Sequence, residues 1–178
     1  MRRKKERRER KVPFFNIFIF KVDKELLLGL VGEALESEDL HDCFLVDIQI
    51  QLPRIEIFID SDEEVTFEKC KKISRHIENV LDAKQYFGDR YILEVSSAGV
   101  GRPLRFPRQY IKNIGRTVEL KTESGRLLKG TIKNAGQENF SIEWEDSERV
   151  GRKRTKIKKE ELFSYSDIQI AKIKISFN

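Results

Sequence analysis

The chain has 178 residues, of which 39% are hydrophobic and 37% are charged, and its net charge is +5. This length allows one domain or two small ones, and this hydrophobic content predicts a folded protein with a core of its own. Two cysteines and two histidines are too few for a disulfide framework or a structural zinc site. We therefore expect no metal and no cofactor, and we expect Cys43 and Cys70 to be buried or half-buried free thiols in a reducing cytoplasm.

The charges are distributed unevenly along the chain. Residues 1–21 contain nine basic and two acidic residues. Residues 22–104 contain nine basic and eighteen acidic residues, and residues 105–178 contain seventeen basic and ten acidic residues. An acidic segment repels polyphosphate and attracts basic protein, whereas a basic segment is typical of proteins that contact RNA. We therefore expect this chain to face both kinds of partner.

Residues 1–21 are predicted to be a basic N-terminal extension. The run RRKKERRERK precedes an apolar stretch that Asn16 interrupts, that is too short to cross a bilayer and that has no small-residue cleavage site. No membrane association is expected. The extension is interpreted either as a disordered arm for nucleic acid or as the product of a misassigned start, with Val22 as the alternative initiation site. The second interpretation is favoured.

Residues 22–97 are predicted to form an α+β domain. Apolar residues at helical spacing predict a helix from Asp23, its N-cap, to Glu36, and Thr66 is predicted to cap a second helix. Strands are predicted at residues 45–50, 55–60 and 91–97, with a hairpin turn at 52–54. The result is a three-stranded sheet covered by two helices.

Asp60, Asp62, Glu63 and Glu64 form an acidic cluster that we tested as a metal site, because hard cations prefer carboxylate oxygens. The cluster lacks the glycine and the bidentate glutamate of a calcium loop. Acidic residues before a helix also stabilise its positive end, and this interpretation is favoured. A metal-dependent nuclease, whose cleavage would be lost on Asp60→Asn, is a further alternative.

The segment LEVSSAGVGRPL, residues 93–104, ends a strand in a sharp turn. Glycine permits positive φ, and Pro103 disfavours helix at the preceding residue. The segment has neither the third glycine of a dinucleotide fingerprint nor the Gly-Lys-Ser/Thr of a phosphate loop. A hinge at residues 98–104 is predicted, and its key residues are Ser97, Gly99, Gly101 and Pro103.

Residues 105–178 are predicted to form a small β-barrel of five strands. Three strands are predicted at residues 117–122, 127–134 and 140–145, with a turn at 123–126, and residues 168–177 are predicted to supply at least one more. Gly130 lies inside the second of these strands, where it permits sharp curvature. Short strands at this spacing are typical of an Sm-like barrel.

Residues 149–159 are the densest basic stretch, predicted as a loop and strand edge. The stretch is interpreted either as a phosphate-contacting surface, which makes binding salt-dependent, or as edge protection by lysine, and the two are compatible. The candidate RNA contacts in the chain are Arg102, Arg105, Arg108, Lys129, Arg149, Arg152, Lys153, Arg154 and Lys156.

The segment from Glu94 to Leu104 resembles the signature of the ribosome maturation factor RimP (YhbC) family, in which a strand ending Glu-Val-Ser-Ser-Pro-Gly joins two domains before Arg-Pro-Leu. The chain departs from that pattern at Ala98, where the family usually has proline, and at Gly101, where it often has aspartate. The resemblance extends over about residues 23–177 and implies the same α+β domain and Sm-like barrel.

This resemblance implies a non-enzymatic assembly factor for maturation of the small ribosomal subunit. Such a factor binds the free subunit through ribosomal RNA and a basic ribosomal protein, and we expect a cytoplasmic monomer. The alternative is a general Sm-like RNA chaperone, which binds unrelated RNA equally well. The sequence lacks the aromatic sheet motif and the Gly-x-x-Gly clamp of sequence-specific RNA readers, so binding is expected to depend on shape and location.

Overall fold

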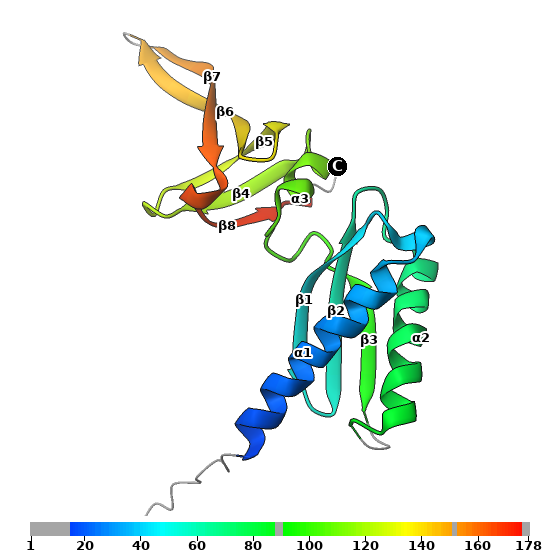
Figure 1. Ribbon diagram of the computed structural model, residues 1–178. Helices are drawn as coiled ribbons and strands as arrows, with labels where there is room; N and C mark the ends of the chain where they lie inside the picture. Colours follow the sequence, from blue (N-terminus) through cyan, green and yellow to red (C-terminus); the bar gives the residue numbers. More distant parts are fainter. Residues whose placement is uncertain (1–14, 88–90, 151–152, 176–178) are drawn as a thin grey trace, which may run out of the picture.

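A computed structural model describes residues 15–87, 91–150 and 153–175 of the chain. It contains an N-terminal α+β domain and a C-terminal β domain that a short segment connects (Figure 1). The N-terminal domain comprises α1 (Phe15–Leu35), a short 3-10 turn (Glu38–Leu40), β1 (Cys43–Gln51), β2 (Arg54–Ser61), α2 (Phe67–Lys84) and β3 (Ile92–Ser97). The C-terminal domain comprises α3 (Pro107–Lys112), β4 (Thr117–Thr122), β5 (Leu127–Ala135), β6 (Asn139–Val150), β7 (Lys153–Ser164), a second 3-10 turn (Tyr165–Asp167) and β8 (Ile168–Ile173).

The N-terminal sheet has the order β1-β2-β3. Strands β1 and β2 form the predicted antiparallel hairpin, and β3 runs parallel to β2 because α2 makes the crossover between them. Thr66 caps α2 as predicted, with its side chain accepting a hydrogen bond from the backbone N–H of Lys69. Asp23 was wrongly predicted as an N-cap, because α1 begins at Phe15 and continues through it.

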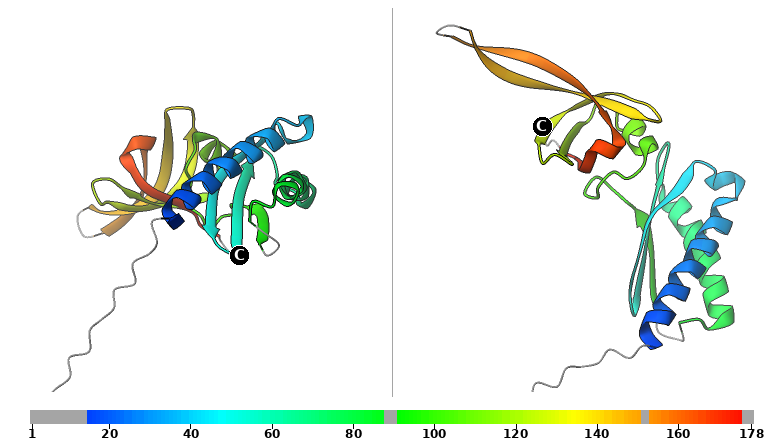
Figure 2. Two further views of the ribbon diagram at one scale, coloured as in Figure 1. Left: turned by 60° about the horizontal axis from the view of Figure 1, so that its bottom comes forward. Right: turned by 60° about the vertical axis from the view of Figure 1, so that its left-hand side comes forward.

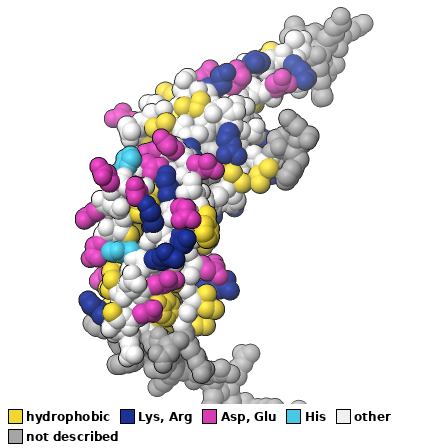
Figure 3. All heavy atoms as spheres, turned by 90° about the vertical axis from the view of Figure 1, so that its right-hand side faces the viewer, with side chains coloured by type: hydrophobic (Ala, Val, Ile, Leu, Met, Phe, Trp, Pro, Cys, Tyr) yellow, Lys and Arg dark blue, Asp and Glu magenta, His cyan; other side chains and the backbone are white. Residues whose placement is uncertain are grey.

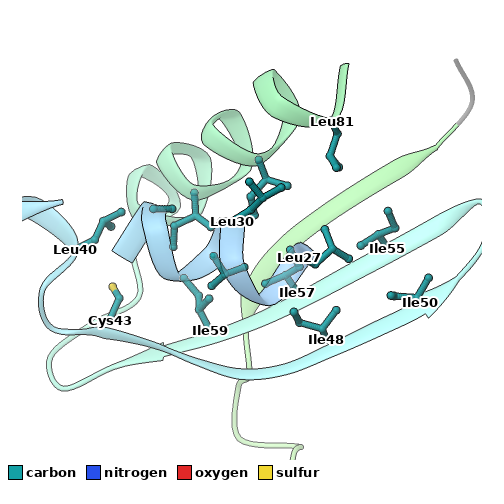
Figure 4. Close-up of a cluster of buried hydrophobic side chains, with 14 residues drawn as sticks. Leu27, Leu30, Leu40, Cys43, Ile48, Ile50, Ile55, Ile57, Ile59 and Leu81 are labelled. Atoms are coloured by element: carbon teal, nitrogen blue, oxygen red, sulfur yellow. The ribbon is translucent and has the colours of Figure 1, made fainter. Parts of the chain in front are cut away.

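One core holds the N-terminal domain together on the face of the sheet that α1 and α2 cover (Figure 4). Leu27 and Leu30 of α1 and Leu81 of α2 pack against the isoleucines of β1 and β2. Cys43 is buried beside this core and Cys70 is half-buried, and both are free thiols, as predicted. Burial, with the nearby charge of Asp42, raises the pKa of Cys43 to about 11.

The C-terminal domain contains a separate antiparallel sheet of five strands in the order β7-β6-β5-β4-β8. The sequence correctly predicts β4 and β5, but the next strand is predicted to end at residue 145. Strand β6 instead continues to Val150 and pairs with β7 along its whole length, so a long hairpin extends away from the rest of the domain (Figure 2). Helix α3 was not predicted. Its Tyr110 packs against Phe140 and Tyr165, with ring centroids 4.5 and 4.9 Å apart.

Gly130 lies where β5 passes close to β6. A Cβ atom at this position would stand 2.6 Å from the backbone carbonyl oxygen of Glu143, which is closer than two such atoms approach one another. Glycine is therefore required here by the neighbouring backbone and not by its φ angle. The sequence predicted a glycine that permits sharp curvature of the strand, and the structure gives a different reason for it, the close approach of β6.

Gly130→Ala is expected to destabilise the C-terminal domain by about 2 kcal/mol, because β5 and β6 must separate to admit the methyl group. The one tryptophan of the chain, Trp144, packs against the C-terminal core, so its fluorescence during urea unfolding reports on that domain. Gly101→Ala is the control, since a Cβ at Gly101 meets no atom within 4 Å. Equal midpoints for the two variants would contradict this explanation of Gly130.

Candidate functional site

The two domains meet at Gly99. Ala98 is buried against Val46 and Phe58 of the N-terminal sheet, and its N–H donates to the carbonyl of Ile59 at 2.8 Å. Two residues later, Val100 packs on the C-terminal core.

Gly99 has a φ of +61°, and its N–H donates to Oγ of Ser97 at 3.2 Å. This positive φ favours glycine at position 99, whereas Gly101 does not have a positive φ. A Cβ atom at either position would meet no atom within 4 Å. The predicted hinge residues thus lie at the boundary between the domains, with Gly99 as the turning point. Leu104, just past Pro103, belongs to the C-terminal core and donates its N–H to the carbonyl of Ala171 on β8 at 2.8 Å.

The arginines that follow this turn lie against the face of the N-terminal sheet that the helices leave uncovered. The guanidinium of Arg102 stacks 3.2 Å from the ring centroid of Phe58, and that of Arg108 lies 4.0 Å from the ring centroid of Phe44. Arg102 and Arg105 both pair with Asp47, at 3.6 and 3.3 Å. These cation–π contacts and ion pairs join the connecting segment to β1 and β2.

Helix α3 adds a second set of contacts, all directed at the end of β2. Lys112 donates to Oδ1 of Asp60 at 2.8 Å and to the carbonyl of Ser61. Gln109 is buried, donates to Oδ2 of Asp60 at 2.9 Å, and accepts the backbone N–H groups of Arg105 and Phe106 through Oε1. Gln109 therefore fixes the start of α3 and the N-terminal sheet at the same time.

Arg108 completes the interface with a bidentate pair to Asp62. The hydrogen bond from Arg108 lowers the pKa of Asp62 below 3.8 and is opposed by burial. Because the folded-state pKa is depressed, the stabilisation from this pair is present above pH 3.8 and is lost only as the pH falls through the lower value. We call the contacts of Arg102, Arg105, Arg108, Gln109 and Lys112 with Asp47, Asp60 and Asp62 the interdomain clamp.

The clamp contains two groups of residues that the sequence analysis singled out, the three arginines after the hinge and part of the acidic cluster. Arg102, Arg105 and Arg108, proposed as RNA contacts, lie at the domain boundary with 30%, 51% and 36% of their side chains exposed. Two residues of the predicted acidic cluster are partners in these contacts: Asp62 pairs with Arg108, and Asp60 pairs with Lys112. Among the described residues, no group of three or more histidines, cysteines or carboxylates is arranged to hold a metal ion.

The predicted basic stretch faces acidic side chains across the β6–β7 hairpin. Three lysines of β7 pair with carboxylates of β6. These pairs are Lys156 with Glu145 at 2.9 Å, Lys158 with Glu143 at 3.5 Å and Lys159 with Asp146 at 2.8 Å. Arg149, Lys153 and Arg154 lie in the paired ends of the two strands, and Arg152 lies outside the described residues. Residues 139–164 contain seven basic and six acidic residues, so the hairpin is nearly neutral.

A different surface of the C-terminal sheet carries lysines without described ion pairs. Lys129 of β5, predicted as a contact, and Lys172 of β8 flank Glu119 of β4, the strand that lies between them. Lys121 of β4 lies between Leu127 and Ile170 in the next row. Leu127 and Ile170 are 78% and 38% exposed, and the hollow between these side chains has a volume of about 440 Å³. We call Lys121, Lys129 and Lys172 with these two apolar residues the lysine face.

Sequence reasoning missed Lys121, Lys172 and Gln109. The two lysines are brought beside Lys129 only by the pairing of β8 with β4, which no local pattern reveals. A local signal for Gln109 was present in the sequence. Pro107 is typical of the first position of a helix, and Gln109 then stands at the third position, where a glutamine can bond back to the backbone that precedes the helix, as in a capping box.

None of the helices in the described part of the chain is long and apolar enough to cross a membrane.

These features define a two-domain α+β protein whose domains are joined through charged side chains. The family described as the RimP N-terminal domain matches residues 31–101. Over 143 residues the chain is 38% identical to the ribosome maturation factor RimP of Christiangramia forsetii, covering 79% of this chain and 91% of that protein. It is 35% identical over 152 residues to the ribosome maturation factor RimP of Flavobacterium psychrophilum, covering 83% and 96%. The chain belongs to the ribosome maturation factor RimP family.

Asp47→Asn is expected to loosen the domain arrangement, because two arginines lose their shared carboxylate. Allowing for solvent screening, the change corresponds to about 1 kcal/mol, or roughly a fivefold shift toward separated domains. Small-angle X-ray scattering should report a larger radius of gyration for Asp47→Asn than for the unaltered chain. Glu63→Gln removes an exposed carboxylate outside the clamp and should leave the profile unchanged; equal profiles for all three would contradict the role of Asp47.

Proposed function

We propose that this chain is a non-enzymatic assembly factor for maturation of the small ribosomal subunit, and that it binds the free subunit through ribosomal RNA and a basic ribosomal protein. The observation that carries the proposal is its membership of the RimP family over nearly the full length of relatives named ribosome maturation factors. The division of charge between the two domains supports it independently.

The RNA contact is assigned first to the lysine face. Its three lysines have no described carboxylate partner, in contrast to Lys156, Lys158 and Lys159 of the hairpin. Exposed Leu127 and Ile170 between the lysines supply apolar area for sugars and bases, while the lysines attract phosphate. The end of the hairpin, with Arg149, Arg152, Lys153 and Arg154, is a second point of contact.

The protein contact is assigned to the acidic N-terminal domain. It contains twice as many acidic as basic residues between 22 and 104, and the clamp uses only Asp47, Asp60 and Asp62 of them. Asp39, Asp42 and Glu94 pair with basic residues of the same domain. Exposed carboxylates without such a pair among the described residues, such as Glu36, Glu38, Glu63 and Glu64, are available for a basic ribosomal protein. The clamp then sets the separation between the protein-binding and RNA-binding surfaces.

An Sm-like barrel is the fold that we propose for the C-terminal domain. Four consecutive antiparallel strands, β4 to β7, precede a fifth, β8, which returns to pair with the first. Register shifts within β4–β8 and β5–β6, together with Gly130, allow the sheet to curve strongly, as a small barrel requires.

The function is tested by co-sedimentation with free small subunits, complete ribosomes and an unrelated structured RNA over a series of salt concentrations. Preference for the free small subunit is expected. Equal binding to all three would contradict the proposal and favour a general RNA chaperone. Magnesium-dependent cleavage that Asp60→Asn abolishes would favour the nuclease.

The lysine face is tested by the triple variant Lys121→Glu, Lys129→Glu, Lys172→Glu. It is expected to weaken binding to free small subunits and to lower the slope of log affinity against log salt by about two, because each phosphate contact contributes about 0.7–0.9. The matched control replaces the same lysines with arginine and should keep the slope. The same slope in both triple variants would contradict the assignment of the RNA contact to the lysine face. The end of the hairpin is then tested by reversing the charges of Arg152, Lys153 and Arg154.

A further inference from the structure

The outer edges of the two sheets differ in how their backbone is protected, and three of the four are covered or charged. At β1, the strand is irregular around Val46, whose carbonyl accepts a hydrogen bond from Arg105. At β8, the carbonyl of Ala171 accepts the N–H of Leu104. At β7, the strand carries a run of basic residues from Lys153 to Lys159. Such features prevent an edge from pairing with another chain.

The fourth edge, β3, has none of these features. Its sequence, ILEVSS, contains no lysine and no proline, its pairing with β2 has no register shift, and its single charged residue, Glu94, pairs with Arg54 of the neighbouring strand. An unprotected edge strand is a template for another strand.

The direction of the free backbone groups of β3 follows from its hydrogen bonds to β2. The N–H of Ile92 donates to Pro53, and the N–H of Ala98 donates to Ile59, so the even-numbered residues between them also face β2. The N–H and C=O groups of Leu93, Val95 and Ser97 consequently point away from the sheet. Within the described part of the chain, no hydrogen bond to the backbone of these three residues on the outer side is present.

A groove runs alongside this edge. It has a volume of about 730 Å³ and is bounded by β3 on one side and by the start and middle of α2 on the other. Phe67, 76% exposed, and Cys70 form an apolar part, while Ser74 and Glu78 form a polar part. Figure 3 looks onto the side of the molecule where α2 lies and shows basic and acidic side chains intermixed there.

We propose that the free edge of β3 binds an extended segment of a small-subunit ribosomal protein as an added strand, with a side chain of that segment against Phe67. The inference rests on the proposed function for the identity of the partner. A polypeptide supplies alternating N–H and C=O groups that can pair with the free backbone groups of this edge, and RNA does not. The groove also offers no excess of positive charge for phosphate, since Lys71 and Arg75 are balanced by Glu78 and Glu94.

Amide hydrogen exchange on the full chain tests the proposal. The probes are RNA-free total protein of the small subunit and, separately, protein-free ribosomal RNA. In the free chain the amides of Leu93, Val95 and Ser97 should exchange rapidly, while those of Ile92, Glu94 and Ser96 are already protected. Addition of the ribosomal proteins should slow the outward set at least tenfold.

Absence of protection in a chain that still co-sediments with free small subunits would overturn the β3 proposal and leave the proposed function standing. Protection by RNA alone would also overturn it. A chain that neither co-sediments nor gains protection would contradict both.

Two variants with a matched control test the contact by affinity for the same protein preparation. Ser97→Pro removes an outward N–H without touching a bond to β2 and is tolerated at a strand edge, and it should weaken binding about tenfold. Ser97→Ala keeps that N–H and should bind within about twofold of the unaltered chain. Phe67→Ala changes an exposed side chain, leaves folding intact and should also weaken binding. Unchanged affinity in both Ser97→Pro and Phe67→Ala would overturn the proposal.

Discussion

The structure depends on the arginines that follow Gly99, because they lie over the face of the N-terminal sheet that α1 and α2 leave uncovered. Phe44 and Phe58 on that face would otherwise be exposed, and the guanidinium groups of Arg108 and Arg102 lie over their rings. Guanidinium groups cover an aromatic ring while keeping hydrogen bonds to carboxylates at the ring edge. The clamp thus adds charged contacts to the apolar contacts that Ala98 makes with Phe58 and that Phe106 makes with Phe44. It determines how far the lysine face lies from the acidic domain.

The basic residues of the C-terminal domain contribute differently to its surface potential in the β6–β7 hairpin and on the lysine face. At β6 and β7, a basic run that the sequence singles out lies opposite glutamates and an aspartate, so its field is largely cancelled along the hairpin. On the lysine face, three lysines spread over three strands gather around a single glutamate. The positive potential of the C-terminal domain is therefore determined by strand pairing more than by the local density of lysine and arginine.

Local patterns predicted most of the elements, because each depends on residues close in sequence. Thr66 as a cap, the hairpin around Pro53 and the strands β4 and β5 follow from such patterns. The start of α1, the length of β6 and β7 and the clamp could not be predicted in this way. Asp23 has the chemistry of a cap but lies inside a longer helix, and the partner of Arg105 is Asp47, 58 residues away. Gly130 was recognised as special, but its cause, the carbonyl of Glu143, belongs to another strand.

The central claim is that the clamp holds the two domains in one arrangement before any partner binds. A direct measurement is the distance between spin labels at Lys84 in the N-terminal domain and Glu138 in the C-terminal domain, both exposed, in a chain whose half-buried Cys70 is replaced by serine. Double electron–electron resonance should give one narrow distance distribution for the free chain, with the same maximum after addition of free small subunits. A broad distribution in the free chain that narrows only on binding would contradict the claim, because the partner and not the clamp would then set the arrangement.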